Sequence, residues 1–274
     1  MLAFLQGDAR QMAKVAATAM GKPGVEDSML SSQADTEGWY GRFRSARRLT
    51  QQAIDSALRN DAKELAARYA VEAAVREIAA GNRQQARTDL AAALKISQTA
   101  PLKGIAALPL AQAGDTATAE KYADELNKTH PLGTVVQRYW LPTLHAAIAL
   151  ERNDPSRALA LLKQTEPMDL AKGVADLYLC PVYLRGQAYL KLGDGKSAAK
   201  EFQKFIDHYG IVGNFPWGAL GRLGLARAYA LDASTDRAAR DRARIVYQDF
   251  LTLWKDAGPD IPIFEQVKAE FTKL

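Results

Sequence analysis

The residues that most often carry chemistry are few in this chain of 274 residues, and they lie far apart. Its histidines, His130, His145 and His208, fall in separate segments, and no two are four residues apart, as a zinc site on one helix would require. The single cysteine, Cys180, has no histidine near it in the sequence to activate a thiolate. The sequence therefore predicts no catalytic residue, no metal site and no cofactor.

One short string, GDGKS from Gly193 to Ser197, is similar to part of a phosphate-binding loop. That loop needs a glycine five residues before Gly195, where Leu190 stands, and it follows a strand. We therefore interpret the string as a turn between helices. The HRD and DFG tripeptides of protein kinases are also absent, so we expect this chain not to be an enzyme.

Composition excludes several other classes of protein. Hydrophobic residues make up 48% of the chain and charged residues 24%, which is typical of a globular domain. The net charge of +5 is small for this length, and the arginine clusters at 42–48 and 237–244 fall on predicted outer helices, so nucleic acid is not an expected partner. There is no apolar run of 18 residues, so we expect no membrane insertion.

A phrase recurs along the chain: glycine or asparagine, small polar residues, and then a small residue that opens an amphipathic run. From Ala46 onward its alanines are 33 to 45 residues apart, which is the length of one helical hairpin. Glycine can end one helix, aspartate can cap the next, and the small side chain lets two helices approach closely. The helices expected from this pattern cover residues 2–5, 8–20, 26–39, 42–58, 61–79, 83–97, 103–113, 116–128, 135–151, 155–164, 170–192, 195–208, 216–231, 237–255 and 261–273.

The clearest unit resembles the tetratricopeptide repeat (TPR) family. Gly186, Tyr189, Gly193, Ala198 and Phe202 match the family's spacing of small and aromatic positions. A neighbouring unit with Ala226, Tyr229, Ala243, Tyr247 and Phe250 shows the same register. The unit departs from the family at Arg185, where leucine is preferred, and at Phe205, where a small residue is usual.

The resemblance implies an all-α fold, a TPR-like solenoid of helical hairpins in a right-handed superhelix with about six repeats and a capping helix. We expect one array over residues 1–274. Residues 1–25 would be an orphan half repeat at a truncated N-terminus, and residues 256–274 would hold a C-terminal capping helix that shields the last hairpin.

A second resemblance runs over the whole length. The phrases AFLQGD, VQRYWLPT, FPWGALGRLGLARAYA and YQDFLTLWKDAGPDIPIFEQVKAE are similar to the C-terminal TPR region of bacterial eukaryotic-like serine/threonine protein kinases and of related winged-helix regulators. This implies a kinase or DNA-binding module upstream of Met1. The chain would then be a soluble domain, either in the cytoplasm or on the outer side of the cytoplasmic membrane.

In TPR proteins the first helix of each pair lines a concave groove, and this family rule selects the candidate binding residues. They are Asp35, Arg68, Trp140, Thr143, Tyr183, Gln187, Lys191 and Arg227. The aromatic anchors and cations among them suit a protein or an extended peptide. An alternative is that Trp140 and Tyr183 only pack between repeats.

Two further aromatic residues, Phe215 and Trp217, interrupt the repeats within the segment YGIVGNFPWGAL. They either plug the groove or offer a contact site in a loop.

Three functions are compatible with these observations. The first is a non-catalytic scaffold that binds a protein or peptide in its concave groove, as part of a larger bacterial signalling protein such as a serine/threonine kinase. The second is a self-association module that forms a homodimer, suggested by the apolar residues Leu2, Phe4 and Leu5. The third is an effector-sensing arm of a transcription regulator, and the fold alone cannot separate the three.

Overall fold

The computed structural model describes residues 1–171, 179–234 and 236–274, and these residues form helices and turns with no strand. The prediction of an all-α fold is confirmed. In the first half of the chain the helices are α1 (Leu2–Leu5), α2 (Ala9–Ala19), α3 (Glu26–Trp39), α4 (Phe43–Arg59), α5 (Lys63–Ala79), α6 (Arg83–Ile96), α7 (Ala100–Gln112) and α8 (Thr116–Thr129). The second half contains η1 (Val136–Trp140), α9 (Leu141–Glu151), α10 (Pro155–Leu162), η2 (Lys163–Met168), α11 (Cys180–Lys191), α12 (Gly195–Asp207), α13 (Tyr209–Val212), α14 (Trp217–Asp232), α15 (Arg237–Leu253) and α16 (Pro262–Thr272).

The recurring phrase forms the turn inside each hairpin. Gly114 and Gly193 have φ angles of +94° and +75°, in the left-handed region that glycine adopts without strain. The aspartate that follows caps the next helix, since Asp115 accepts a hydrogen bond from the Thr118 amide at 3.1 Å. Asp194 does the same for Ser197 at 2.9 Å, so the GDGKS string is a helix turn, as predicted.

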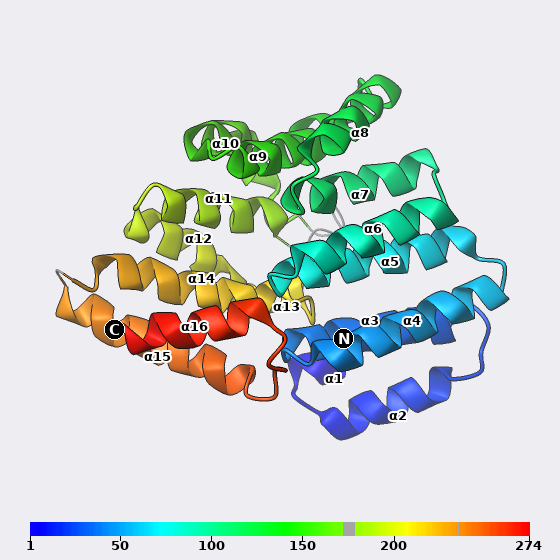
Figure 1. Cartoon of the computed structure of the whole chain (residues 1–274), viewed down its shortest axis with the longest axis horizontal. Helices are drawn as coiled ribbons and strands as arrows, with labels where there is room; N and C mark the ends of the chain where they lie inside the picture. The colour runs from blue at the N-terminus through cyan, green and yellow to red at the C-terminus, as the bar shows by residue number, and fades with distance from the viewer. Residues whose placement is uncertain (172–178, 235) are drawn as a thin grey trace.

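Helices pack in neighbouring pairs, and the described residues hold six such pairs. The first helix of each pair belongs to what we name the inner helices, α3, α5, α7, α9, α11 and α14, and the second to the outer helices, α4, α6, α8, α10, α12 and α15. Figure 1 shows the pairs following one another in an arc from α3 and α4 through α9 and α10 to α14 and α15. The helical solenoid that the repeats predict is therefore present.

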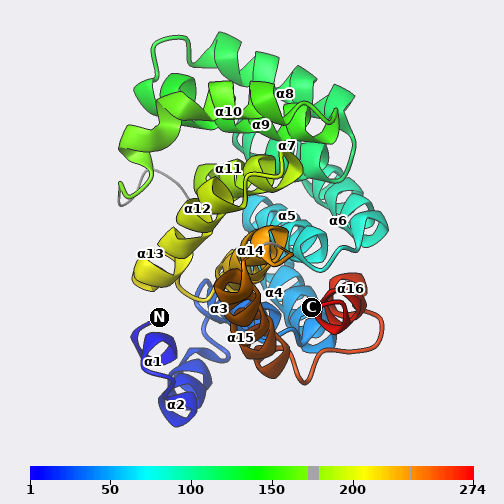
Figure 2. The same cartoon turned by 90° about the vertical axis from the view of Figure 1, so that its left-hand side faces the viewer.

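The arc closes on itself, which the repeat pattern did not predict. Each inner helix contacts the next one in order, and α14 at the end of the series contacts α3 at its beginning. Figure 2 shows α14 lying beside α3, with α5 and α11 on its other sides. The inner helices therefore form a closed ring. Most of their buried apolar side chains belong to one hydrophobic cluster, and a second, smaller cluster holds Leu30 and Ala34 of α3 with Ala66 and Tyr69 of α5.

Several bonds join the two ends of the ring, at a contact that we name the seam. Trp254, which has no exposed surface, donates from Nε1 to the Trp39 carbonyl oxygen at 3.0 Å across 215 positions of sequence. The Asn214 amide donates to the Ser32 carbonyl oxygen at 2.7 Å. Arg47 on α4 pairs with Asp260 at 3.0 Å. The seam thus combines buried aromatic surface with polar contacts of specific geometry.

Glycines let the helices of the C-terminal pairs approach one another. The Phe202 ring of α12 lies so close to α11 and α14 that a Cβ at Gly186 or at Gly224 would be within 2.6 Å of it. The Phe205 ring occupies the equivalent space at Gly221, also at 2.6 Å. The departure from the family at Phe205 is therefore compensated by a glycine on the next inner helix.

The other departure, Arg185, belongs to a buried ionic cluster. This arginine is 2% exposed and bonds to Asp169, to Glu201 at 3.0 Å and to the Thr165 hydroxyl at 3.1 Å. Its guanidinium links α11 to η2 and α12, so the polar side chain replaces the usual leucine without leaving its charge unpaired.

The predicted helix boundaries agree with the structure to within a few residues, with one clear exception. The helix expected over residues 170–192 begins only at Cys180, because Leu179 has a φ of +64° and residues 170–171 are not helical. The part of that prediction over residues 172–178 lies outside the described residues. The short helix α13 was not predicted.

The terminal segments also differ from expectation. The predicted capping helix is present as α16, but it does more than shield the last hairpin. It packs on α15, and the Ile263 amide donates to the Ala80 carbonyl oxygen at the end of α5, at 3.2 Å. Helix α16 therefore bridges the last pair and the second pair of the ring. Residues 1–25 form α1 and α2, and α2 packs on α3.

Candidate functional sites

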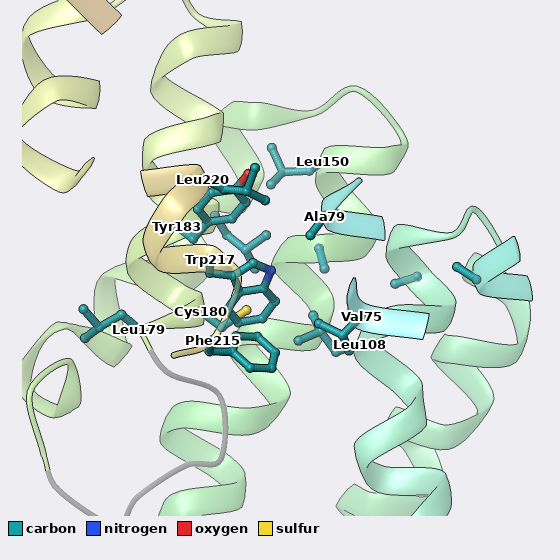
Figure 3. Packing of buried hydrophobic residues seen from close by; sticks show 14 of the residues in the cluster. Val75, Ala79, Leu108, Leu150, Leu179, Cys180, Tyr183, Phe215, Trp217 and Leu220 are labelled. Atoms are coloured by element: carbon teal, nitrogen blue, oxygen red, sulfur yellow. The ribbon is translucent and has the colours of Figure 1, made fainter. Parts of the chain in front are cut away.

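Closure of the ring fills the groove that the family resemblance predicts. Figure 3 shows Tyr183, Trp217 and Phe215 in a column on the α11 and α14 side, facing Leu150, Ala79, Val75 and Leu108 from the other inner helices. The Tyr183 and Trp217 rings are stacked with centroids 5.9 Å apart, and Phe215 meets Trp217 edge-on at 5.2 Å. These side chains therefore occupy the inner face of the ring, where the family resemblance predicts a concave groove.

The two aromatic residues predicted as either a plug or a contact site are both in this column. Trp217 is 1% exposed and Phe215 is 6% exposed, and Trp217 is the first residue of α14 and not part of a loop. The plug interpretation agrees with this burial. A partner could contact Trp217 only if the ring of inner helices opened.

Beside the aromatic column lies a central cavity of about 140 Å³. Five of the six inner helices contribute to its wall, together with the start of α16. The apolar part of the wall includes Leu150, Leu184 and Leu220, and the polar part includes Tyr183, Gln187 and Arg227. Three of the predicted binding residues therefore meet here, around a small cavity that is partly open to solvent.

The charged groups of the central cavity are already paired. Arg227 makes a bidentate pair with Glu270 of α16, at 2.9 and 3.0 Å. Arg83 makes another with Glu151 at 2.7 and 2.8 Å, at the end of the cavity where Arg83 is 54% exposed. Burial raises the pKa of the Tyr183 hydroxyl, so the phenol stays protonated. The charges of these two arginines are thus balanced by those of the two glutamates.

The remaining predicted groove residues are dispersed. Thr143 is fully buried in α9, and its hydroxyl donates to the Tyr139 carbonyl oxygen at 2.5 Å. Arg68 bonds to Glu72 one turn along α5 at 3.0 Å, and the exposed Lys191 donates to Asn153 at 3.3 Å. Binding by these residues has no structural support beyond their positions.

Asp35 of α3 belongs to a group of hydrogen-bonded side chains that joins neighbouring helices. It accepts a hydrogen bond from Arg76, which is 2% exposed, at 2.5 Å, and Arg76 also donates to the Thr50 hydroxyl at 2.6 Å. Burial raises the pKa of the Asp35 carboxyl to about 7, while the Arg76 guanidinium opposes that rise. The contacts tie α3 to α4 and α5, which explains this acid without a ligand.

Trp140, the last of the predicted groove residues, lies on the outside of the ring in a second candidate site. It helps to line a cleft of about 500 Å³ between α7, α8 and η1, which we name the outer cleft. Its apolar wall is made by Ile105, Tyr122, Leu126, Val136 and Trp140. The side chain of Trp140 is only half-buried, so its aromatic surface is accessible to a partner.

The backbone beside the outer cleft is irregular. Residues Val136–Trp140 form a π-helical turn, a geometry that occurs frequently at functional sites. Leu132 in the preceding loop is 93% exposed, and Val135 is 36% exposed. Both residues lie between His130 and Val136 in the sequence, and those two residues line the cleft.

Charge at the rim of the outer cleft is mainly positive. Lys103, Lys128 and His130 line it, and the one carboxylate among its lining residues is Glu125. That carboxylate is paired with Lys103 at 3.2 Å, and the Lys103 ammonium also lies 5.6 Å from the centre of the Tyr122 ring. A negatively charged partner would meet the uncompensated Lys128.

Sequence reasoning missed the two residues that matter most at these sites. Gln112 lines the central cavity and Gly104 lines the outer cleft. Gly104 lies inside the largely apolar segment APLKGIAALPLAQ, which forms α7, and Gln112 is its last residue. An amide or a glycine in a predicted apolar helix could have indicated a functional position. The sequence pattern, however, does not show whether such a residue faces a neighbouring helix or a cavity.

Within residues 1–171, 179–234 and 236–274, no cluster of three or more His, Cys, Asp or Glu side chains is arranged to hold a metal ion. The same residues include no helix with the length and apolar character needed to cross a bilayer. Cys180 is fully buried, and burial raises the pKa of its thiol.

No protein-family profile matches this chain, and no curated protein is similar enough to it to count as a match.

Proposed function

We propose that this chain is a non-catalytic protein-binding module that captures a segment of a partner protein in the outer cleft. The observation that carries the proposal is the accessible apolar cleft of about 500 Å³ around Trp140. Aromatic residues at such positions are the usual anchors of protein interfaces, because they bury a large apolar area with little loss of side-chain entropy.

The chemistry of the cleft defines the partner. Ile105, Leu126 and Val136 would surround one bulky apolar side chain, and Tyr122 and Trp140 would flank it. Lys128 at the rim favours an acidic residue beside that anchor. The proposed partner segment is therefore a peptide or helix with an apolar anchor and at least one neighbouring aspartate or glutamate.

The class of the array and its parent protein are further parts of this proposal. The TPR-like register of the repeats supports a right-handed TPR superhelix, here closed by the seam. The resemblance to the TPR regions of bacterial serine/threonine kinases supports a role as the interaction region of a larger signalling protein. In that setting the outer cleft would recruit a partner to the kinase.

Gly104 gives a direct test, because its position in α7 offers space for a side chain. A Cβ at Gly104 would meet only Leu126 Cδ1, at an ordinary 3.9 Å, so alanine fits and leaves the cleft open. Leucine at the same position would extend from the helix towards α8 and fill the cleft. Gly104→Leu is the blocking variant, and Gly104→Ala is the matched control.

The assay is photo-crosslinking from Leu132, whose 93% exposure makes replacement by a photoreactive phenylalanine harmless to the fold. In lysate of the source cells, we expect a heterologous protein to crosslink to the wild type and to Gly104→Ala but not to Gly104→Leu. The crosslinked segment should carry an apolar residue beside an acidic one. Equal crosslinking with all three chains would refute the outer cleft as the site. A product of twice the chain's mass, with no other partner, would favour self-association instead.

A further inference from the structure

We infer that the central cavity is a binding site for a small neutral molecule that carries an apolar ring and one hydrogen-bond donor. This site is separate from the outer cleft, and the inference does not depend on the proposed protein partner. It rests on the size of the cavity, the paired state of its charges and one buried polar atom that lacks a partner.

The unpaired atom is Oε1 of Gln112. Gln112 is 8% exposed, lines the cavity at the end of α7, and its Oε1 has no hydrogen-bond partner. Leaving a buried carbonyl unpaired costs free energy, so such atoms usually accept a bond from a ligand or from water. Because a carbonyl oxygen can only accept, Gln112 Oε1 would be satisfied by a donor group of a bound molecule that reaches it.

The body of the cavity favours an uncharged ring. Its volume of about 140 Å³ is close to that of an engineered cavity that binds benzene in another protein, about 150 Å³. Leu150, Leu220 and Trp217 supply apolar contact surface. Both arginines are already bonded to carboxylates, so a charged ligand would have to break one of those pairs.

The location also gives the ligand an effect on the fold. The wall combines residues from α5, α7, α9, α11 and α14, so a bound molecule would contact five inner helices at once. A ligand that binds only this arrangement stabilises the closed ring by mass action. Occupancy would therefore raise the resistance of the whole ring to unfolding.

The test uses ¹⁹F NMR titration of the full chain with three probes of similar size. They are 4-fluorophenol, which has a donor, fluorobenzene, which has none, and 4-fluorobenzoate, which is charged. We expect saturable one-to-one binding of 4-fluorophenol, about fivefold weaker binding of fluorobenzene, since one hydrogen bond contributes about 1 kcal/mol, and no binding of the benzoate.

Two variants assign the binding to this cavity. Gln112→Leu keeps the volume of the side chain and removes the carbonyl, so it should abolish the preference for 4-fluorophenol while fluorobenzene still binds. Ala147→Val places an extra methyl pair on the cavity wall, where Ala147 is 1% exposed, and should weaken both ligands. If either variant fails to fold by circular dichroism, the other still assigns the site.

Two results would overturn the inference. The first is the absence of saturable binding of every probe at millimolar concentration, which would identify a cavity filled by water only. The second is binding of 4-fluorophenol that both folded variants leave unchanged, which would place the ligand elsewhere. Neither result bears on crosslinking at the outer cleft, so the two proposals fail independently.

Discussion

Replacing Gly218 by alanine should strain the seam of the ring. Gly218 of α14 lies directly against the Trp39 ring of α3, and a Cβ at this position would be 2.0 Å from Trp39 Cζ3. Carbon atoms in contact are about 3.5–4.0 Å apart, so the two helices must separate by about 1.5 Å or more. Trp39 is 7% exposed, and Phe4 packs against another side of its indole, with 5.4 Å between the ring centroids. The indole therefore has little room to turn away from a Cβ at Gly218.

The expected loss of stability follows from two opposing terms. Forcing a methyl group into a packed contact costs about 1–3 kcal/mol. Alanine in place of glycine inside a helix returns about 0.5–1 kcal/mol. We therefore expect Gly218→Ala to lower the free energy of unfolding by about 1–2 kcal/mol, or the midpoint temperature by about 2–4 °C for each kcal/mol in a chain of this size.

The matched control is the same substitution at Gly210 in α13, where a Cβ would meet no atom within 4 Å. Thermal unfolding followed by circular dichroism gives the stability of both variants. Hydrogen exchange read by mass spectrometry gives the location, and exchange should accelerate in α3 and α14 of Gly218→Ala while α7 and α8 stay protected. Equal stability of the two variants, or acceleration that spares α3 and α14, would refute the closed ring.

Three further predictions concern single groups. The hydrogen bond from Arg47 lowers the pKa of Asp260 below its ordinary value of 3.8, so this carboxylate adds stability above that pH and loses it on acidification. Asp260→Asn should therefore be less stable than the wild type at pH 7 in urea unfolding, and a difference that persists unchanged well below pH 3.8 would contradict this assignment. Cys180, with its raised pKa and full burial, should react with a thiol reagent such as dithionitrobenzoate only as fast as the chain unfolds, and rapid labelling of the native protein would show that the packing is wrong. Trp254→Phe removes the donor to the Trp39 carbonyl oxygen and should cost about 1–3 kcal/mol in the free energy of unfolding, whereas an unchanged urea midpoint would mean that this bond does not hold the seam.

The sequence alone determined the helices and their pairing. Hydrophobic periodicity, the left-handed glycines such as Gly114 and the capping aspartates such as Asp115 act over a few residues, so they can be recognised without knowledge of the fold. The repeat spacing then set the number of hairpins and the order of inner and outer helices. The TPR class and the parent kinase remain proposals from resemblance.

Part of the candidate sites was also visible in the sequence. The family rule placed Tyr183, Gln187 and Arg227 on inner faces, and the structure brings them to one cavity. Trp140 instead lines the outer cleft, at the end of a π-helical turn that the sequence pattern did not predict. The rule could not select Gln112, because an amide in an apolar helix has the same pattern whether it faces a neighbour or a cavity.

Only the tertiary structure decided that the array closes. Each helix pair adds a small rotation to the one before it, and the sum over six pairs determines whether the ends meet or pass each other. Those rotations depend on local fits such as the Phe202 ring between Gly186 and Gly224, which no repeat pattern specifies. The contact of Trp254 with Trp39 spans 215 positions, and it forms because the accumulated rotation brings two distant surfaces together. The filled inner face and the central cavity are consequences of that closure, whereas the outer cleft is formed by the neighbouring elements α7, α8 and η1.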